Sequence, residues 1–448
     1  MQRDVRKIWL AIKRHWYLAW PLILANIATP LLALSDVAIA GHLTEAKYLA
    51  SVTIGAELIT FIFWIFGFFR MGTTGLISQA AGEKNELKKA QIFSNSILMA
   101  LVTGIIVTVI ALFLKTIFVQ SLSENSKLND LIETYFSIRL LATPAVLMTY
   151  VIYGWLIGNS HTKIAVILTF TVNMLNILLN IYFAIFLELN SNGIALGTLI
   201  AEWFGLFFGL SCIIYITKKN PLKSLYDFNK RTLIVLARIN GPLFLRTIVL
   251  KIVFVSFTLE SIKLGIDLAA AIGVFLIILS SIAHCIDGFS FASEIEAGNS
   301  IGSMSFENFI YSLWAGAIWT FVSIIFFNIL LLSFGSSLIN LLTSHSKVAN
   351  SAISLIPILC LFLVVAAPSY WLDGVFIGLT RVKDMCLTVI LATLIGWYGS
   401  MFLVGTETLN GLLFTFFSFG TLRTVLLFLR LKTAIKSFKH QFSSHLNL

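Results

Sequence analysis

Apolar runs separated by short polar breaks follow one another along the whole 448-residue chain. Each run can cross a bilayer as a helix, which needs about 20 residues at a rise of ~1.5 Å per residue. The pattern therefore predicts twelve transmembrane helices and an all-α integral membrane fold. Their expected ranges are 17–41, 49–80, 91–119, 131–158, 164–188, 193–216, 234–259, 267–300, 308–333, 350–379, 385–404 and 409–430.

The first run is not built as a passive anchor. Pro21 and Pro30 each remove a backbone donor inside the helix, and Asp36 puts a carboxylate in the apolar run. A charge at membrane depth costs roughly 3 kcal/mol or more, so a retained one usually faces protein or water. Asp36 could instead reach the interface from the outer end of its span, but its side chain is short for that. We expect a bent helix with a functional acid.

Composition indicates that lipid is the solvent of this chain. Hydrophobic residues are 58% and charged residues 12%, whereas soluble domains have about 25% charged residues. The net charge of +10 could suggest nucleic-acid binding. The basic residues, however, lie mainly in the breaks between runs, as orientation in a membrane requires. The bilayer is thus an expected partner and nucleic acid is not.

Lysine and arginine are distributed unequally between alternate breaks, with 20 on one side and 4 on the other. The richer side is expected to be cytoplasmic. Both termini then lie in the cytoplasm, in agreement with an even number of spans. The basic amino terminus leads into a full-length span with no small-residue cleavage site nearby, so we expect a retained first helix.

The longest polar break lies almost at the midpoint of the chain. We expect an N-terminal lobe at 1–216, a cytoplasmic linker at 217–233 and a C-terminal lobe with a basic tail at 234–448.

An internal repeat relates these two halves. The matches share an offset of 220 or 221 residues, and equal six-span halves with both starts cytoplasmic predict a parallel repeat. The matching pairs are YGWLIGNSHTK at 153–163 with DGVFIGLTRVK at 373–383, QAAG at 79–82 with NSIG at 299–302, and Pro21 with Pro242.

Common catalytic and nucleotide-binding motifs are missing from the sequence. It contains no GxxxxGK[ST] or HExxH pattern, and no metal-ligand cluster is predicted. No loop is long enough for a soluble nucleotide-binding module. We therefore expect no enzyme and no cofactor, and any transport must draw its energy from an ion gradient or a partner.

Intramembrane polar residues are the remaining chemical signal. Asn173, Asn176 and Asn180 are spaced i, i+3, i+7 and share one helical face, and Thr198 and Glu202 share another. One interpretation is helix–helix bonding, although such bonds average only ~0.6 kcal/mol in membranes. The other is a polar cavity lining that faces Asp36.

The second half carries acids before glycine in two runs, Asp287 and Asp373. These could line the opposite wall of a central substrate cleft, or they could pair with an arginine such as Arg246. In the first half, Arg70 and Arg139 are expected as pair partners or rim charges.

Several motifs, in order and over essentially the whole chain, resemble the multidrug and toxic compound extrusion (MATE) family, and its DinF-like branch in particular. They are SDVAIAGHL at 35–43, RMGTTGLISQAAG at 70–82, NMLNILLN at 173–180, GIALGTLIAEW at 193–203, DGFSFASEIEAGNSIG at 287–302 and LDGVFIGLTR at 372–381.

The resemblance implies two pseudo-symmetric six-helix bundles around a V-shaped cleft, in a monomer of the bacterial inner membrane. It implies export of organic cationic or amphipathic compounds in exchange for protons or sodium ions. Asp36 matches the family's coupling carboxylate, and Pro21 its helix bend. Asn176 and Thr198 match the cation-linked polar cluster, with Tyr135 as an expected neighbour.

One position departs from the family pattern. Relatives commonly carry a second aspartate four residues after the position of Asn176, where this chain has Asn180. Fewer carboxylates make a poorer site for a hard cation, which prefers oxygen donors. The departure favours protons over sodium.

Two other functions remain open from the sequence. A lipid-linked oligosaccharide flippase of the same superfamily would be expected to have a strongly basic cleft, whereas the basic residues here lie mainly in loops. An intramembrane enzyme could use Asp287 and Asp373 as a carboxylate dyad, but no recognisable catalytic constellation accompanies them.

Overall fold

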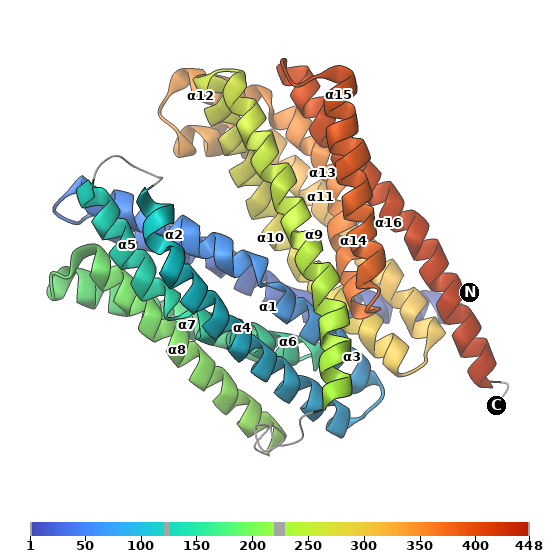
Figure 1. Cartoon of the computed structure of the whole chain (residues 1–448). Coiled ribbons are helices and arrows are strands. Elements are labelled where there is room, and N and C mark those ends of the chain that lie inside the picture. The colour runs from blue at the N-terminus through green and yellow to red at the C-terminus, as the bar shows by residue number, and fades with distance from the viewer. Residues whose placement is uncertain (1, 121–125, 219–228, 447–448) are drawn as a thin grey trace. The chain divides into compact units, whose positions relative to one another are not determined.

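The computed structural model describes residues 2–120, 126–218 and 229–446, and the regular elements in these ranges are all helices (Figure 1). Part of the predicted linker, 219–228, lies outside the described residues. The elements, with η for π-helical segments, are α1 (Gln2–Gly41), α2 (Ala46–Ile65), α3 (Phe68–Gly82), α4 (Glu86–Gln120), α5 (Ser126–Leu140), α6 (Thr143–Gly158), α7 (Thr162–Ile181), η1 (Tyr182–Phe186), α8 (Asn190–Thr217), α9 (Lys230–Lys263), α10 (Ile266–Gly302), α11 (Phe306–Leu342), α12 (Ser346–Ser354), α13 (Ile356–Gly378), α14 (Val382–Leu391), η3 (Ala392–Gly399), α15 (Ser400–Val404) and α16 (Leu409–Leu446).

The predicted all-α membrane fold is confirmed. Among the described residues, 11 helices are long and apolar enough to cross a membrane, and there are 12 spans if one bent pair counts as a single span. That pair is α5 and α6, which meet at an angle of 46° inside the predicted span 131–158. Pro144 lies at the start of α6. A proline is tolerated in a first helical turn but cannot continue the helix before it, because it lacks the N–H donor.

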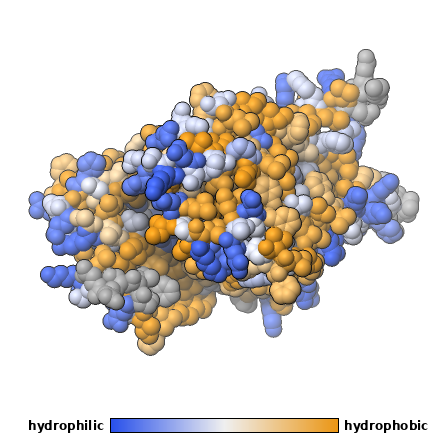
Figure 2. Space-filling view, turned by 90° about the horizontal axis from the view of Figure 1, so that it is seen from above, coloured by the Kyte–Doolittle hydropathy of each residue, from blue (hydrophilic) through white to orange (hydrophobic). Residues whose placement is uncertain are grey.

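The surface of the helices is that of a protein solvated by lipid. Large apolar side chains lie open to the surroundings, among them Phe113 at 83%, Tyr215 at 84% and Phe402 at 87% exposure. Figure 2 shows apolar residues over much of one face, with polar residues in separate patches. In water such a surface would drive association, and in a bilayer it is matched to its solvent.

The chain divides into two compact units, residues 24–240 and residues 1–23 with 241–448. These bounds differ from the expected lobes, because the first 23 residues go with the second half of the chain. In that unit Trp319 donates to the Ile12 carbonyl oxygen at 3.0 Å, and His15 Nδ1 lies 2.8 Å from a Glu296 carboxylate oxygen. Long-range side-chain contacts of this kind, which no periodicity reveals, set the boundary.

The helices that pass from one unit to the other do so beside the two matched prolines. Helix α1 changes unit after Ile23, two residues beyond Pro21, and α9 changes unit at Gly241, one residue before Pro242. A proline inside a helix removes one backbone hydrogen bond and lowers the cost of bending there. Each half of the repeat therefore starts with a weakened helix at the unit boundary.

The internal repeat extends to backbone packing. Gly154 and Gly158 of α6 lie against backbone carbonyls of α3, and Gly374 and Gly378 of α13 lie against backbone carbonyls of α10. Small residues at such contacts let membrane helices approach closely. The carbonyl partners also differ by 220 residues, namely Arg70 and Ser290 for the first glycine of each pair, and Thr74 and Glu294 for the second.

The turns after these helices repeat as well. Lys84 and Met304 have φ of 56° and 49°, and Ser160 and Thr380 have φ of 65° and 53°. Non-glycine residues adopt this left-handed conformation at a cost of roughly 1 kcal/mol or more. Its recurrence at the same offset in both halves supports a common origin of the two loops.

Replacement of Gly374 by alanine is expected to lower the free energy of unfolding by about 1–3 kcal/mol. The new Cβ would overlap the Ser290 backbone oxygen, which cannot move without moving α10. Gly273→Ala is the matched control, because a Cβ there meets nothing within 4 Å. Thermal unfolding in detergent should show a lower Tm for Gly374→Ala only, and equal Tm values would contradict the packing account.

Candidate functional site

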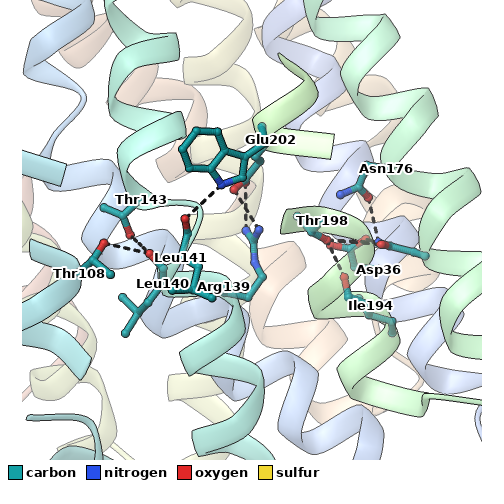
Figure 3. Close-up of polar contacts among 12 residues, drawn as sticks. Asp36, Thr108, Arg139, Leu140, Leu141, Thr143, Asn176, Ile194, Thr198 and Glu202 are labelled. Carbon is teal, nitrogen blue, oxygen red and sulfur yellow. Dashed lines mark hydrogen bonds and ion pairs between the residues drawn. The ribbon is translucent and has the colours of Figure 1, made fainter. Parts of the chain in front are cut away.

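Asp36 lies in α1, half-buried and five residues before the helix ends at Gly41. Its Oδ1 accepts a hydrogen bond of 2.8 Å from Nδ2 of Asn180 on α7. Asn180 is fully buried, and its Nδ2 also donates to Oδ1 of Asn176 at 2.9 Å. Figure 3 shows Asp36, Asn176 and Thr198 gathered on one side of the close-up. The Asn180 NH₂ group thus donates one N–H to Asp36 and the other to Asn176.

Thr198 extends this network to α8. Its Oγ1 lies 3.4 Å from Asn180 Nδ2 and 3.5 Å from Asn180 Oδ1, and it donates to the Ile194 carbonyl oxygen at 2.9 Å. Thr198 is buried. The three helices α1, α7 and α8 therefore meet in one polar cluster, which we call the Asp36 cluster: Asp36, Asn176, Asn180 and Thr198.

The third asparagine of α7 also faces α1. Asn173 Nδ2 donates to the Ala28 carbonyl oxygen at 3.2 Å, two turns from Asp36. The i, i+3, i+7 face predicted from the sequence thus lies toward α1. Asn173 bonds to backbone, whereas Asn176 and Asn180 bond to side chains of the cluster.

A glycine makes the cluster possible. A Cβ on Gly197 of α8 would overlap Oδ1 of Asn180 and would lie 2.8 Å from its backbone nitrogen. We expect Gly197→Ala to displace the Asn180 side chain, because no neighbouring space is available to its buried amide. The matched control is Gly41→Ala, where a Cβ meets nothing within 4 Å.

The expected result for Gly197→Ala is a loss of substrate export of about tenfold, since a misplaced positioning residue can cost up to ~10²-fold. Export by reconstituted protein, normalised to the amount in the vesicles, measures it. Unchanged export by Gly197→Ala would mean that the Asn180–Asp36 bond is not needed.

An ion pair lies next to the cluster. Arg139 of α5 contacts both carboxylate oxygens of Glu202 on α8, at 3.2 Å and 3.1 Å. Arg139 is buried, and Tyr135, one turn earlier on α5, is almost fully buried with its ring against Gly55. Of the two roles expected for Arg139, pair partner or rim charge, the structure shows the pair. The part expected for Tyr135 beside the cluster stays a prediction.

Apolar packing brings this pair and Asp36 into one region. Tyr135 of α5 packs in one buried group with Ile39 and Ala40 of α1 and with Ile194 of α8. Ile39 follows Asp36 by three residues, and Thr198 follows Ile194 by one turn. The acid and its neighbours are thus fixed by a shared hydrophobic contact as well as by hydrogen bonds.

The acids predicted for a second cleft wall lie in the other unit. Asp373 of α13 is buried and pairs through one oxygen with both Arg246 of α9 and Arg423 of α16. Asp287 of α10 is half-buried and interacts electrostatically with Arg246. Of the two alternatives left open from the sequence, pairing with Arg246 is present in the structure. Arg423 was not anticipated as a partner.

The side chains of the described residues offer no cluster suited to a metal ion. Among residues 2–120, 126–218 and 229–446, no group of three or more His, Cys, Asp or Glu side chains could hold a metal ion. The Asp36 cluster has one carboxylate with amide and hydroxyl groups, which suits hydrogen bonding better than transition-metal ligation.

The structure defines a multi-pass helical membrane protein with a buried polar cluster around one intramembrane acid, the arrangement of a transporter rather than of an anchor. Comparison with known proteins is consistent with that class. The MatE family model matches residues 21–182 and 242–402. The chain belongs to this family of multidrug efflux transporters, which are not enzymes.

Individual relatives agree with the family. DNA damage-inducible protein F of Escherichia coli (strain K12) is 32% identical over 378 residues, 83% of this chain and 82% of that protein. A probable multidrug resistance protein NorM of Photorhabdus laumondii is 25% identical over 382 residues, again 83% and 82%. The fold matches solved structures: the Vibrio cholerae MATE transporter VcmN in the bent form has a TM-score of 0.86 at 17% identity, covering 97% of this chain and 99% of VcmN. A MATE in complex with MaD3S has a TM-score of 0.87 at 19% identity, covering 96% and 97%.

Proposed function

We propose that this protein is a proton-coupled antiporter that exports organic cationic or amphipathic compounds by alternating access, with Asp36 as the coupling acid. The observation that carries the proposal is the Asp36 cluster, in which a single carboxylate accepts an amide hydrogen bond of 2.8 Å inside a membrane span. The substrate class is supported by relatives that are named as a probable multidrug resistance protein and as a multidrug export protein.

Protonation of Asp36 would rearrange its hydrogen bonds. The ionised carboxylate is an acceptor and is matched by the amide N–H of Asn180. A protonated carboxyl group has an O–H that needs an acceptor, and an NH₂ group cannot serve. If Asn180 is to accept this O–H, its amide must turn its Oδ1 toward Asp36, which breaks the bond from its Nδ2 to Oδ1 of Asn176. Otherwise the O–H must turn to an acceptor outside α7. Either change alters the contact of α1 with α7 and α8.

The bend that follows is assigned to Pro21. Helix α1 carries Asp36 fifteen residues after Pro21, and the missing backbone hydrogen bond there lowers the cost of bending. In the outward-open state Asp36 is ionised; proton binding bends α1 and releases the substrate. The coupling requires that proton and cation favour different states, since a ligand shifts an equilibrium only by its differential affinity.

The location, orientation and partners of the protein are part of the same proposal. The protein would act as a monomer in the bacterial inner membrane with both termini cytoplasmic, where Lys and Arg are concentrated. Its partners would be small organic cations and the bilayer. Sodium is the alternative coupling ion, but with Asn180 next to Asp36 the cluster offers one carboxylate for it.

The experiment uses purified protein in liposomes with ethidium, a flat fluorescent cation. A pH gradient and a sodium gradient are imposed separately, and the dye is recovered and checked for chemical change. Dye movement driven by the pH gradient, without modification of the dye, is expected. Movement driven by sodium alone, or no gradient-driven movement, would contradict proton coupling.

A further inference from the structure

The Arg139–Glu202 pair has a fixed place beside the coupling acid. Glu202 follows Thr198 by four residues on α8, and Arg139 follows Tyr135 by four residues on α5, so each shares a helical face with a member or neighbour of the Asp36 cluster. Figure 3 shows the Arg139 guanidinium group directed at Glu202. Thr198 and Asp36 lie to the right of this pair in the same view.

The ion pair and an aromatic ring place the guanidinium group of Arg139. Two Arg139 nitrogens contact two Glu202 oxygens at 3.1–3.2 Å, and the arginine carbon Cζ lies 5.9 Å from the centre of the Phe63 ring on α2. The Nη2–Oε1 contact is a hydrogen bond, and the Nη1–Oε2 contact adds a charge interaction without hydrogen-bond geometry. Arg139 is 8% exposed, so removal of its carboxylate partner would leave a buried cation.

Three titratable groups on neighbouring helices act electrostatically on Asp36 within the described residues. Within the described part of the chain, Arg139, Glu202 and the Tyr135 hydroxyl are the titratable groups that interact electrostatically with Asp36, and its neighbours on α7 are uncharged amides. With Asp36 ionised, the region carries one cation and two anions. With Asp36 protonated, the charges cancel.

We propose that Arg139, held in place by Glu202, is the element that excludes sodium from Asp36 and makes this acid selective for protons. The proposal rests on the proton coupling proposed above and deepens it. Arg139 is a positioning and selectivity residue, not a carrier of the coupling proton.

The chemical reason is the difference between the two coupling ions. A proton binds to one carboxylate oxygen and needs no further ligands. A sodium ion needs several oxygen donors around it and a net negative site, as hard cations do. A fixed guanidinium group repels the sodium ion and occupies Glu202, the second carboxylate that the ion could otherwise share with Asp36.

Substitutions of the pair should move the pH dependence of export in opposite directions. Arg139→Gln removes a cation near Asp36, so the pH of half-maximal export should rise by about one unit, and Glu202→Gln should lower it by a similar amount. The double variant restores neutrality and should return close to the wild-type midpoint. A purely structural role would reduce activity without these opposed shifts.

Sodium selectivity is measured in the same liposomes as the rate of export driven by a sodium gradient. Arg139→Gln removes the cation that pairs with Glu202 and acts on Asp36, so export should now respond to a sodium gradient, and NaCl should raise Tm relative to equal choline chloride. The matched control is Arg238→Gln, the same charge change at an exposed position of α9, which should behave as wild type.

Unmoved pH midpoints in folded, active Arg139→Gln and Glu202→Gln, with no response to sodium, would overturn the selectivity proposal while leaving proton coupling intact. If Arg139→Gln fails to fold, the shift in Glu202→Gln and its reversal in the double variant decide the question. Loss of pH-driven export in wild type, or its retention in Asp36→Asn, would instead defeat the proposed function itself.

Discussion

Liposomes that contain the Asp36→Asn variant are expected to lose pH-gradient-driven export of ethidium, with the initial rate at least about tenfold below wild type. Asparagine has nearly the same shape as aspartate and can accept the Asn180 hydrogen bond, so the cluster at 2.8 Å can persist. It cannot exchange a proton. Proton binding normally shifts the free-energy difference between the outward-open state and the state that follows it, by about a few kcal/mol for a carboxylate in a protein interior. The variant therefore lacks this shift.

The remaining activity of Asp36→Asn should also be independent of pH, since the titrating group is gone. Asp130→Asn is the matched control, because Asp130 is an exposed acid on α5 in the same unit. It should export at the wild-type rate with the wild-type pH profile. A pH-dependent Asp36→Asn variant with full activity would place the coupling acid elsewhere.

The second large effect is expected from Asp373→Asn, which should lower the stability of the folded protein. Asp373→Asn removes the charge that Arg246 and Arg423 share in the interior of α9, α13 and α16. Breaking a buried ion pair from one side costs about 3–5 kcal/mol, because the partner charges stay buried and unpaired. We expect low yield and a clearly lower Tm in detergent.

This outcome separates structural pairing from the substrate role considered for Asp373 in the sequence. A wall residue of a substrate cleft would leave Tm unchanged in Asp373→Asn and would lower export or substrate affinity. The control is Asp267→Asn, an exposed acid at the start of α10, which should change stability by less than about 1 kcal/mol.

The membrane fold could be predicted from the sequence because apolar length alone decides a span. Each of the twelve predicted runs corresponds to one of the 11 candidate spans or to the bent α5–α6 pair. The glycine pairs at 154 and 158 and at 374 and 378 were visible as a repeat, and they pack on backbone in both halves. What could not be predicted was the unit to which residues 1–23 belong, since that depends on distant contacts.

Part of the polar site could also be predicted from the sequence, because the spacing of residues along one helix determines which of them share a face. Helical periodicity places Asn176 and Asn180 on one face; Asn180 contacts Asp36, and Asn176 contacts Asn180. The pairing of Arg139 with Glu202 depends on how α5 and α8 are rotated about their axes, which spacing within one helix does not determine. The sequence signal for it was only that Glu202 follows Thr198 of the cluster by four residues and that Arg139 follows its neighbour Tyr135 by four residues.

The most direct test of the central claim is proton release on substrate binding. Ethidium is added to purified protein in weakly buffered detergent solution with a pH indicator, near the pH of half-maximal export. If Asp36 exchanges its proton for the cation, wild type should release up to about one proton per bound dye, and Asp36→Asn should release none. Equal proton release by both proteins, or none by wild type, would contradict the account.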